Sequence, residues 1–185
     1  MTIATEQMTV EAFRRFAELP ENEGKLLELI NGNIEEKEVG STFPSSIAAT
    51  LIFLFGLYLR GKGLGTLTAT DGSYDLDEVN SPMPDVAFIS FARMPEMPRR
   101  AAQGAPDLAV EIKSPTDRVR NMRKKAELYL SHGTRIVWLV FPETRTVEVY
   151  DAAADVAIFG GRQELNGGDV LPGLVIKVDE IFEGI

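Results

Sequence analysis

Cysteine is absent from this sequence, and histidine is nearly so: His132 is the single one among 185 residues. Without thiols the chain has no disulfide framework, no thiolate metal site and no cysteine nucleophile. A metal site or a nucleophile in this protein must therefore be built from other side chains.

Positive charge is also in short supply. Lysine and arginine number 19 against 28 aspartates and glutamates, which gives a net charge of -9 and a pI of about 4.7. Proteins that bind nucleic acid non-specifically along its length are usually basic, so the overall balance argues against that role. It leaves room for a local basic patch within a site.

The sequence shows neither a signal peptide nor an apolar run of membrane-spanning length. The start, MTIATEQMTVEAF, lacks the charged-then-apolar layout of a signal peptide. The longest apolar run, Ile47 to Leu59, is too short for a membrane span and contains Gly56. We therefore expect a cytoplasmic protein without a membrane partner. No repeat or long linker divides the chain, so residues 1–185 are expected to form one domain with a core.

The first third of the chain predicts a helix, a hairpin and a second helix. Thr9 is suited to cap a short amphipathic helix. Asn31-Gly32, between LLELI and NIEEKEV, is a strong hairpin signal. Ser45 or Ser46 is expected to cap an apolar helix that runs to about Arg60. That helix is apolar on most sides, which is typical of a buried helix or a subunit interface.

The remainder predicts an α/β (α+β) fold, with a central mixed sheet flanked by helices. Short strand-like segments LGTLTAT, SYDLD, DVAFI and DLAVEIK precede a helical pattern from about Arg118 to His132. The buried strand RIVWLVF follows, and then TVEVYD after a turn. A strand, a helix and a second buried strand form a crossover unit with parallel strands. The tail predicts a turn, a strand and a closing helical turn.

The stretch APDLAVEIKSP is the most unusual in the sequence. Strand alternation places Glu111 and Lys113 on one face of an apolar strand. Burying charge is costly unless the charge is paired or binds a metal. Two other E-x-K tripeptides, ending at Lys25 and Lys37, lie in a polar loop and in an acidic hairpin strand that we expect to be exposed. The specific signal is the third tripeptide together with Asp85, which opens the preceding buried strand.

This set of side chains suits phosphodiester chemistry. Carboxylates from neighbouring strands, such as Asp85 and Glu111, are the oxygen ligands that Mg²⁺ prefers, and a bound metal lowers the pKa of a water molecule. A lysine beside the metal can orient or deprotonate that water or stabilise an anionic transition state. Burial lowers the pKa of a lysine whereas a neighbouring carboxylate raises it, and the residues alone leave the balance for Lys113 open.

The order of these motifs along nearly the whole chain resembles the Uma2 family of the PD-(D/E)XK restriction-endonuclease-like superfamily. The resemblance rests on LLELINGNI, Pro84-Asp85, PDLAVEIKSP, a helix with Lys125 and Tyr129, VWLV and GGDVLPG. It implies an αβββαβ core, here with an N-terminal hairpin extension.

The resemblance also implies the roles of individual residues. Asp85 and Glu111 would be metal ligands for Mg²⁺ or Mn²⁺, Glu28 a further ligand, and Lys113 the catalytic lysine. Lys125 would reach phosphate. Many relatives carry a histidine near the start of the second helix, where this chain has Ser45-Ser46. The substrate would be DNA, cleaved to a 3′-hydroxyl and a 5′-phosphate.

Each of these residues also has a structural interpretation. Glu111 and Lys113 could form an ion pair with each other, and Glu28 could lie on the solvated face of its hairpin. Asp107 is more typical of a turn after Pro106. His132 suits a helix C-terminus, and Trp138 suits the core.

The densest positive charge lies at the start of the predicted third helix. It consists of Arg118, Arg120, Arg123, Lys124 and Lys125. These residues could form a solvated helix face, but cations near a helix N-terminus oppose the helix dipole. A basic patch beside an acidic site is what a phosphodiester substrate requires. We assign Arg118, Arg120, Arg123 and Lys125 as candidate phosphate-binding residues.

Two functional hypotheses follow from the sequence. The first is a Mg²⁺-dependent phosphodiesterase, a DNA endonuclease. The second is a catalytically inactive nuclease-like domain that acts as a nucleic-acid-binding or regulatory module. In both, the apolar helix around Ile47 to Leu59 predicts a homodimer.

Overall fold

A six-stranded mixed sheet forms the centre of the computed structural model, which describes residues 7–37, 42–151 and 156–184. The strand order is β10-β9-β8-β7-β5-β3. The bounds of these strands are β3 Gly65–Ala69, β5 Val86–Ser90, β7 Leu108–Ile112, β8 Ile136–Phe141, β9 Thr146–Asp151 and β10 Ala157–Gly160. Strands β7 and β8 are parallel, and their other neighbours pair antiparallel.

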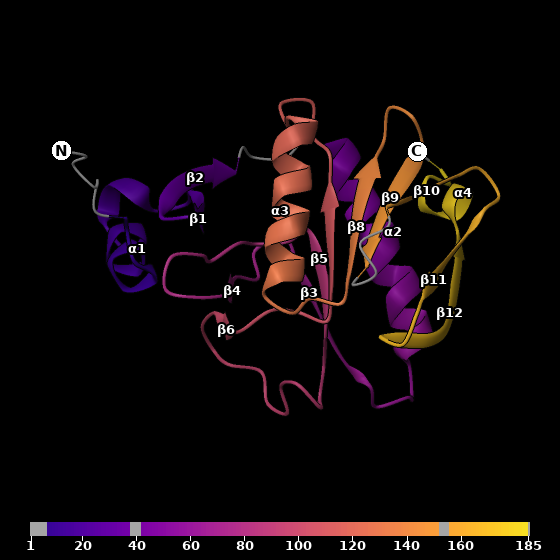
Figure 1. Ribbon diagram of the computed structural model, residues 1–185, viewed down its shortest axis with the longest axis horizontal. Helices are drawn as coiled ribbons and strands as arrows, with labels where there is room; N and C mark the ends of the chain where they lie inside the picture. The colour runs from indigo at the N-terminus through magenta and orange to yellow at the C-terminus, as the bar shows by residue number, and fades with distance from the viewer. Residues whose placement is uncertain (1–6, 38–41, 152–155, 185) are drawn as a thin grey trace.

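The sheet is covered on both faces by a helix. Helix α3 (Val119–Ser131) lies in front of the sheet and α2 (Thr42–Leu59) behind it (Figure 1). The alternation of strand β7 decides which side chain meets which helix. Leu108, Val110 and Ile112 join the α2 side, whereas Ala109 packs on the α3 side.

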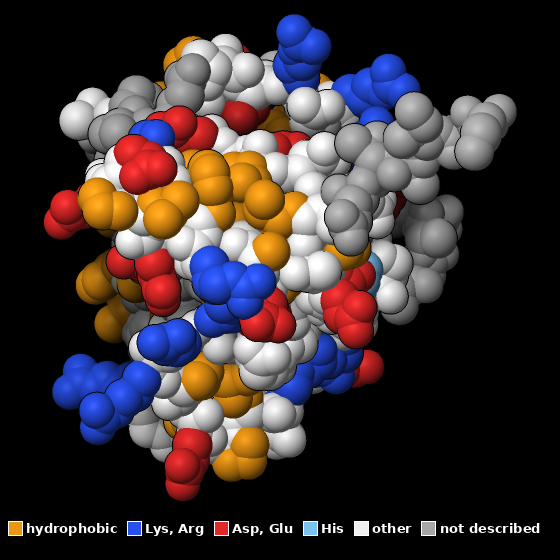
Figure 2. Space-filling view, turned by 90° about the vertical axis from the view of Figure 1, so that its left-hand side faces the viewer, with side chains coloured by type: hydrophobic (Ala, Val, Ile, Leu, Met, Phe, Trp, Pro, Cys, Tyr) orange, Lys and Arg blue, Asp and Glu red, His pale blue; other side chains and the backbone are white. Residues whose placement is uncertain are grey.

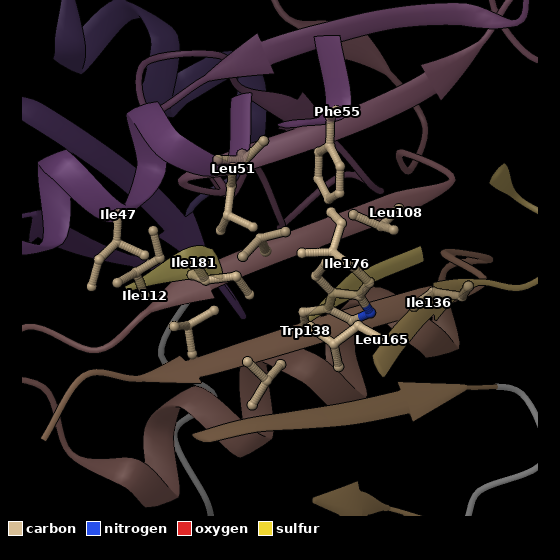
Figure 3. Close-up of a cluster of buried hydrophobic side chains, with 14 of the residues drawn as sticks. Ile47, Leu51, Phe55, Leu108, Ile112, Ile136, Trp138, Leu165, Ile176 and Ile181 are labelled. Carbon is tan, nitrogen blue, oxygen red and sulfur yellow. The ribbon is translucent and has the colours of Figure 1, made fainter. Parts of the chain in front are cut away.

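The larger core lies between α2 and the sheet (Figure 3). Helix α2 contributes Ile47, Leu51 and Phe55, spaced four residues apart and all fully buried. Phe55 packs against Trp138 of β8, with ring centroids 5.4 Å apart. Trp138 is thus a core residue, as the sequence indicated.

The tail closes this core at one end. Strands β11 (Glu164–Gly167) and β12 (Leu171–Lys177) form a hairpin, and the short helix α4 (Val178–Ile181) follows. Leu165, Ile176 and Ile181 from these elements pack into the α2 core.

The N-terminal elements lie at the other end of the molecule (Figure 1). Helix α1 (Val10–Ala17) begins after Thr9, whose side chain accepts a hydrogen bond from the Ala12 amide. A short 3-10 helix, η1 (Pro20–Asn22), leads into the antiparallel hairpin of β1 (Leu26–Ile30) and β2 (Asn33–Lys37). Its turn places Asn31 and Gly32 at φ of 51° and 72°, which explains the Asn-Gly pair.

The predicted fold is confirmed. Elements α2, β3, β5, β7, α3 and β8 give the αβββαβ order, with the predicted parallel crossover from β7 to β8. A small parallel pair, β4 (Tyr74–Asp75) and β6 (Ala102–Gln103), lies beside the sheet. The prediction that Ser45 or Ser46 caps α2 is wrong. The helix begins at Thr42, and the Ser46 hydroxyl donates to the Phe43 carbonyl within it.

Helix α2 is longer than the apolar run in the sequence suggested. With 18 residues and a mean hydropathy of 1.7, it is the one described helix that could cross a membrane by length and composition. The core helix of a soluble protein passes the same test, and α2 packs one face against the sheet. The absence of a membrane partner therefore stays a prediction.

Candidate active site

A buried cluster of charged side chains lies on the α3 side of the sheet, where the N-terminal hairpin meets it. Three carboxylates and two ammonium groups share it, together with one tyrosine hydroxyl. Its members are Glu28, Lys37, Asp85, Glu111, Lys125 and Tyr129.

Glu111 is one of the two buried acids of this cluster. It follows Ala109 on the α3 face of β7 and is only 6% exposed. The Lys125 Nζ lies 2.9 Å from its Oε1, and the Tyr129 hydroxyl donates to the same oxygen at 2.8 Å. Lys125 and Tyr129 are four residues apart in α3, so both point from one helix face toward β7.

Asp85 stands next to Glu111 through the pairing of β5 with β7. Val86 pairs with Val110, so Asp85, one residue earlier, is placed opposite Glu111. The Asp85 carboxylate accepts a hydrogen bond from the Ile112 amide at 2.7 Å. Its position is therefore fixed by the end of β7.

Glu28 reaches the cluster from the hairpin. Its two carboxylate oxygens lie 2.7 and 3.0 Å from Lys125 Nζ, and the Met83 amide also donates to it. Glu28 is buried, so the solvated-face interpretation of this residue does not hold. Lys125 thus bridges Glu28 and Glu111, which are 83 residues apart in sequence.

Lys37 is the site residue that the sequence analysis missed. Its Nζ donates to Asp85 Oδ1 at 2.9 Å and to the Met83 carbonyl at 2.8 Å. We expected its strand to be exposed, but the Lys37 side chain is only 18% exposed. The hairpin register could have indicated this, because Glu28 pairs with Glu35, two residues before Lys37, and all three share one face.

Burial and mutual attraction shift the pKa values within the cluster. Burial raises the pKa of Glu111 to about 7, although Lys125 and Lys37 partly oppose the shift. Burial lowers the pKa of Lys125 and of Lys37, but the neighbouring carboxylates outweigh it and raise both. Burial, together with the charge of Glu111, raises the pKa of Tyr129 well above its usual value. The lysines therefore stay cationic, and Glu111 is the group that titrates near neutral pH.

A groove of about 480 Å³ gives access to this cluster. Glu28, Lys37, Glu111 and Lys125 line it from within. The outer part of its hairpin wall carries acidic groups, including Glu35 and Glu36. The opposite wall, at the start of α3, includes Asn121 with the basic Arg118 and Lys124.

Residues 10–179 match the Uma2 family, whose description reads "Putative restriction endonuclease". The chain belongs to the Uma2 family. Among solved structures it is similar to a protein from Anabaena variabilis described as a "putative nuclease belonging to DUF820". The two share 22% sequence identity and a TM-score of 0.81, over 95% of this chain and 97% of that one. No curated protein matches this chain.

Lys113, which the resemblance assigns as the catalytic lysine, contacts none of the carboxylates in this Uma2 cluster. It follows the last residue of β7, and its Nζ lies 2.8 Å from Glu143 Oε1 and 3.0 Å from the Ser114 carbonyl. The hydrogen bond from Lys113 lowers the pKa of Glu143. Glu111 and Lys113 therefore do not pair with each other, and the structure does not bring them to one point.

The candidate phosphate-binding residues divide into two groups. Lys125 is buried between Glu28 and Glu111, and Arg123 pairs with Glu148 at 2.5 Å, so both already have anionic partners. Arg118 and Arg120 are exposed, and only Arg118 also lines the groove.

The donor atoms of the site suit a divalent metal ion in type but not in arrangement. Three carboxylates offer the oxygen ligands that Mg²⁺ prefers. Their oxygens, however, already bind Lys125, Lys37 and Tyr129. Across residues 7–37, 42–151 and 156–184, no three His, Asp or Glu side chains are grouped so that they could hold a metal ion. An ion would have to displace an ammonium group.

Two residues with structural interpretations lie outside the site. Asp107 accepts a hydrogen bond from the Ser90 amide and lies near Arg93 and Arg135. His132 caps the C-terminus of α3 and contacts Asp77 through Nε2.

Proposed function

We propose that this Uma2 protein is a phosphodiesterase, a DNA endonuclease, whose active site is the cluster around Glu111. Membership of a family described as "Putative restriction endonuclease" and the fold shared with a "putative nuclease" support nuclease chemistry of the restriction-endonuclease-like type. The single observation that carries the proposal is the convergence of Glu28, Asp85 and Glu111 on two lysines. Glu28, Glu111 and both lysines also line one groove.

The residues of the site have chemistry that suits hydrolysis of a phosphodiester. Burial raises the pKa of Glu111 to about 7 in the site without a metal ion, so in that state its carboxylate can take a proton from water at neutral pH. Water would attack phosphorus, the bond to the 3′ oxygen would break, and the leaving oxygen would take up a proton. Fixed cations stabilise charge that develops on the phosphate oxygens.

Restriction-endonuclease-like proteins generally use divalent metal ions, and we extend the proposal to Mg²⁺ or Mn²⁺ as cofactor. Asp85, Glu111 and Glu28 are the proposed donors because they are the three carboxylates of the cluster, with Glu28 and Glu111 buried and the Asp85 side chain 15% exposed. Arg118 and Arg120 are exposed and are the proposed contacts to the DNA backbone. The resemblance would assign Lys113 as the catalytic lysine, but its Nζ bonds Glu143 and the Ser114 carbonyl instead.

Cleavage of DNA tests this proposal directly. Supercoiled and single-stranded DNA would be incubated with wild type, Asp85→Asn and Glu111→Gln, each with Mg²⁺, with Mn²⁺ and with chelator. We expect metal-dependent nicking by wild type and a loss of at least about 100-fold in both variants. Equal activity in all three proteins would indicate a contaminating nuclease and contradict the proposal.

A second function is favoured by one observation. Lys37 and Lys125 already neutralise most of the acidic charge of the site. This is expected for a catalytically inactive domain that binds nucleic acid or has a regulatory role. DNA binding without cleavage under any metal condition would support this alternative.

We further propose a homodimer that forms through α2. This helix buries Leu51 and Phe55 but leaves Phe53 and Leu57 on its outer face 62% and 54% exposed. Phe43, near its start, is exposed as well. Large exposed apolar patches mark association surfaces. The cytoplasmic location stays a prediction from the sequence.

A further inference from the structure

We propose that Lys37, and not Lys113, is the lysine that contacts the reacting phosphate. This inference rests on the proposed nuclease function and assigns the role to a residue of the N-terminal hairpin. Lys37 ends an E-x-K tripeptide at the last residue of β2, and Lys113 ends another just after β7, so their different partners can be compared directly.

The position of the Lys37 ammonium group is fixed by two contacts. It donates to Asp85 Oδ1 at 2.9 Å and to the Met83 carbonyl at 2.8 Å. An ammonium group has three hydrogens to donate. Among the residues that the structure describes, these two acceptors leave one hydrogen without a partner. Lys37 also lines the groove, so that hydrogen has a route to a bound substrate.

The other lysine of the cluster is fully used within the protein. Lys125 donates to both oxygens of Glu28, at 2.7 and 3.0 Å, and lies 2.9 Å from Glu111. Its side chain is 14% exposed. Contact with a phosphate would require Lys125 to release a buried carboxylate, which is costly.

The Lys113 side chain lies outside the cluster around Glu111. Its partners are Glu143 in the turn after β8 and the carbonyl of Ser114. Lys113 is also not among the residues that line the groove around Glu111. Its charge is thus paired outside the cluster.

The hairpin that carries Lys37 is anchored to the segment that carries Asp85. Leu29 and Ser81 exchange backbone hydrogen bonds of 3.3 and 2.8 Å, and the Gly32 amide donates to the Val79 carbonyl at 2.8 Å. Residues 79–83 lead directly into Asp85. Lys37 and Asp85 are therefore held by two segments that are hydrogen-bonded to each other. This arrangement lowers the entropic cost of fixing the long Lys37 side chain beside Asp85.

This geometry predicts what Lys37 does. Its bond to Asp85 orients the ammonium group, and the remaining N–H donates to a phosphate oxygen as negative charge develops there. Such a contact acts more strongly in the transition state than in the bound substrate, so its loss lowers kcat more than it raises KM.

The experiment compares Lys37→Met with Lys113→Met, and Lys25→Met is the matched control. Lys25 precedes the same hairpin, is exposed and bonds only Asn22 among the described residues. Steady-state cleavage of a fluorescent DNA substrate gives kcat and KM for each protein. We expect Lys37→Met to lower kcat by about 100-fold or more with KM changed less than about threefold, and Lys113→Met to lower kcat by less than about tenfold.

Lys37→Gln guards against a variant that fails to fold. Its amide can donate a hydrogen bond but carries no charge, so we expect a folded protein with a cooperative melting curve and the same loss of kcat. Near-wild-type kcat in a folded Lys37→Gln or Lys37→Met protein would overturn the inference, as would a larger loss in Lys113→Met. In both cases the proposed nuclease function would stand. If wild type cleaves no DNA under any metal condition, both proposals fail together.

Discussion

Lys125 is the residue on which the electrostatic balance of the site depends most. It is the shared counter-ion of Glu28 and Glu111, and all three side chains are largely buried. Removing one partner of a buried ion pair leaves an uncompensated charge, which costs more than the pair itself contributes.

We therefore expect Lys125→Met to lower the free energy of unfolding at pH 8 by about 3–5 kcal/mol. Protonation of Glu111 below its pKa would reduce this loss at lower pH. Urea unfolding followed by circular dichroism measures the change. Lys124→Met, one residue away and exposed, is the control and should change stability by no more than about 0.5 kcal/mol. Equal small effects in the two variants would contradict the bridging role of Lys125.

The same variant tests the proposed metal ligands. Without the ammonium group, Glu28 and Glu111 become available to a cation, so Mn²⁺ should raise the melting temperature of Lys125→Met more than that of wild type. Differential scanning fluorimetry with and without Mn²⁺ measures this. An identical Mn²⁺ response in both proteins would argue against Glu28 and Glu111 as ligands.

Glu111 predicts a pH dependence of stability with a defined sign. Burial raises its pKa from the ordinary 4.5 to about 7. The folded protein therefore holds this proton up to about pH 7, whereas the unfolded chain releases it near 4.5. The stabilising contribution is complete below pH 4.5 and is lost as the pH rises to 7. Its size is on the order of 3 kcal/mol.

Glu111→Gln removes this titration but keeps an oxygen that can accept from Tyr129. Relative to wild type, the stability of the variant should therefore rise between pH 5 and pH 7.5. Chemical unfolding of both proteins over this range gives the difference. Parallel pH profiles would show that Glu111 does not titrate there.

At the scale of elements, two glycines have opposite predicted effects. Gly56 lies in the interior of α2, is exposed, and an added Cβ would meet nothing within 4 Å. Glycine in a helix interior costs about 0.5–1 kcal/mol relative to alanine. Gly56→Ala should therefore raise the free energy of unfolding by about that amount, measurable in urea. A loss of stability would mean that this position is covered in the native protein.

Gly32→Ala should have the reverse effect. Gly32 adopts φ of 72° in the hairpin turn, and an added Cβ would lie 2.7 Å from the Cβ of Gln7. Left-handed backbone costs a residue with a Cβ about 1–2 kcal/mol. We expect a destabilisation of at least that size, and a wild-type unfolding curve would be inconsistent with the turn described above.

At the scale of the whole molecule, surface charge bears on contact with DNA, whereas exposed apolar surface bears on self-association. The face on the side of α1 and the hairpin intermixes basic and acidic side chains and shows no continuous basic patch (Figure 2). With a net charge of -9, contact with DNA would have to depend on a local set of groups at the groove.

The outer face of α2 predicts self-association. Wild type should elute as a dimer in size-exclusion chromatography with light scattering, and Phe53→Ser with Leu57→Ser should elute as a monomer. Phe91→Ser, an exposed phenylalanine outside α2, is the control and should leave the dimer intact. Monomeric wild type would remove the dimer proposal.

Local sequence patterns by themselves determined most of the elements. Alternation in β7 assigned Leu108 and Val110 to one face and Glu111 to the other, and Asn31-Gly32 fixed the hairpin. The strand faces and the turn depend on periods and turn chemistry that are local to the chain. The αβββαβ core and the site roles of Glu28, Asp85 and Glu111 were instead implied by the resemblance to the Uma2 family.

Only the tertiary structure decided which lysines lie beside Glu28, Asp85 and Glu111. Lys113 is adjacent to the motif but extends beyond β7 to Glu143, whereas Lys37 reaches Asp85 across 48 residues of sequence. Lysine has a long, flexible side chain, so its partner is set by which carboxylate the fold brings within reach and not by its neighbours in the chain. Strand periodicity fixes the direction of a Cβ, but ion pairing depends on distances between segments that only folding brings together.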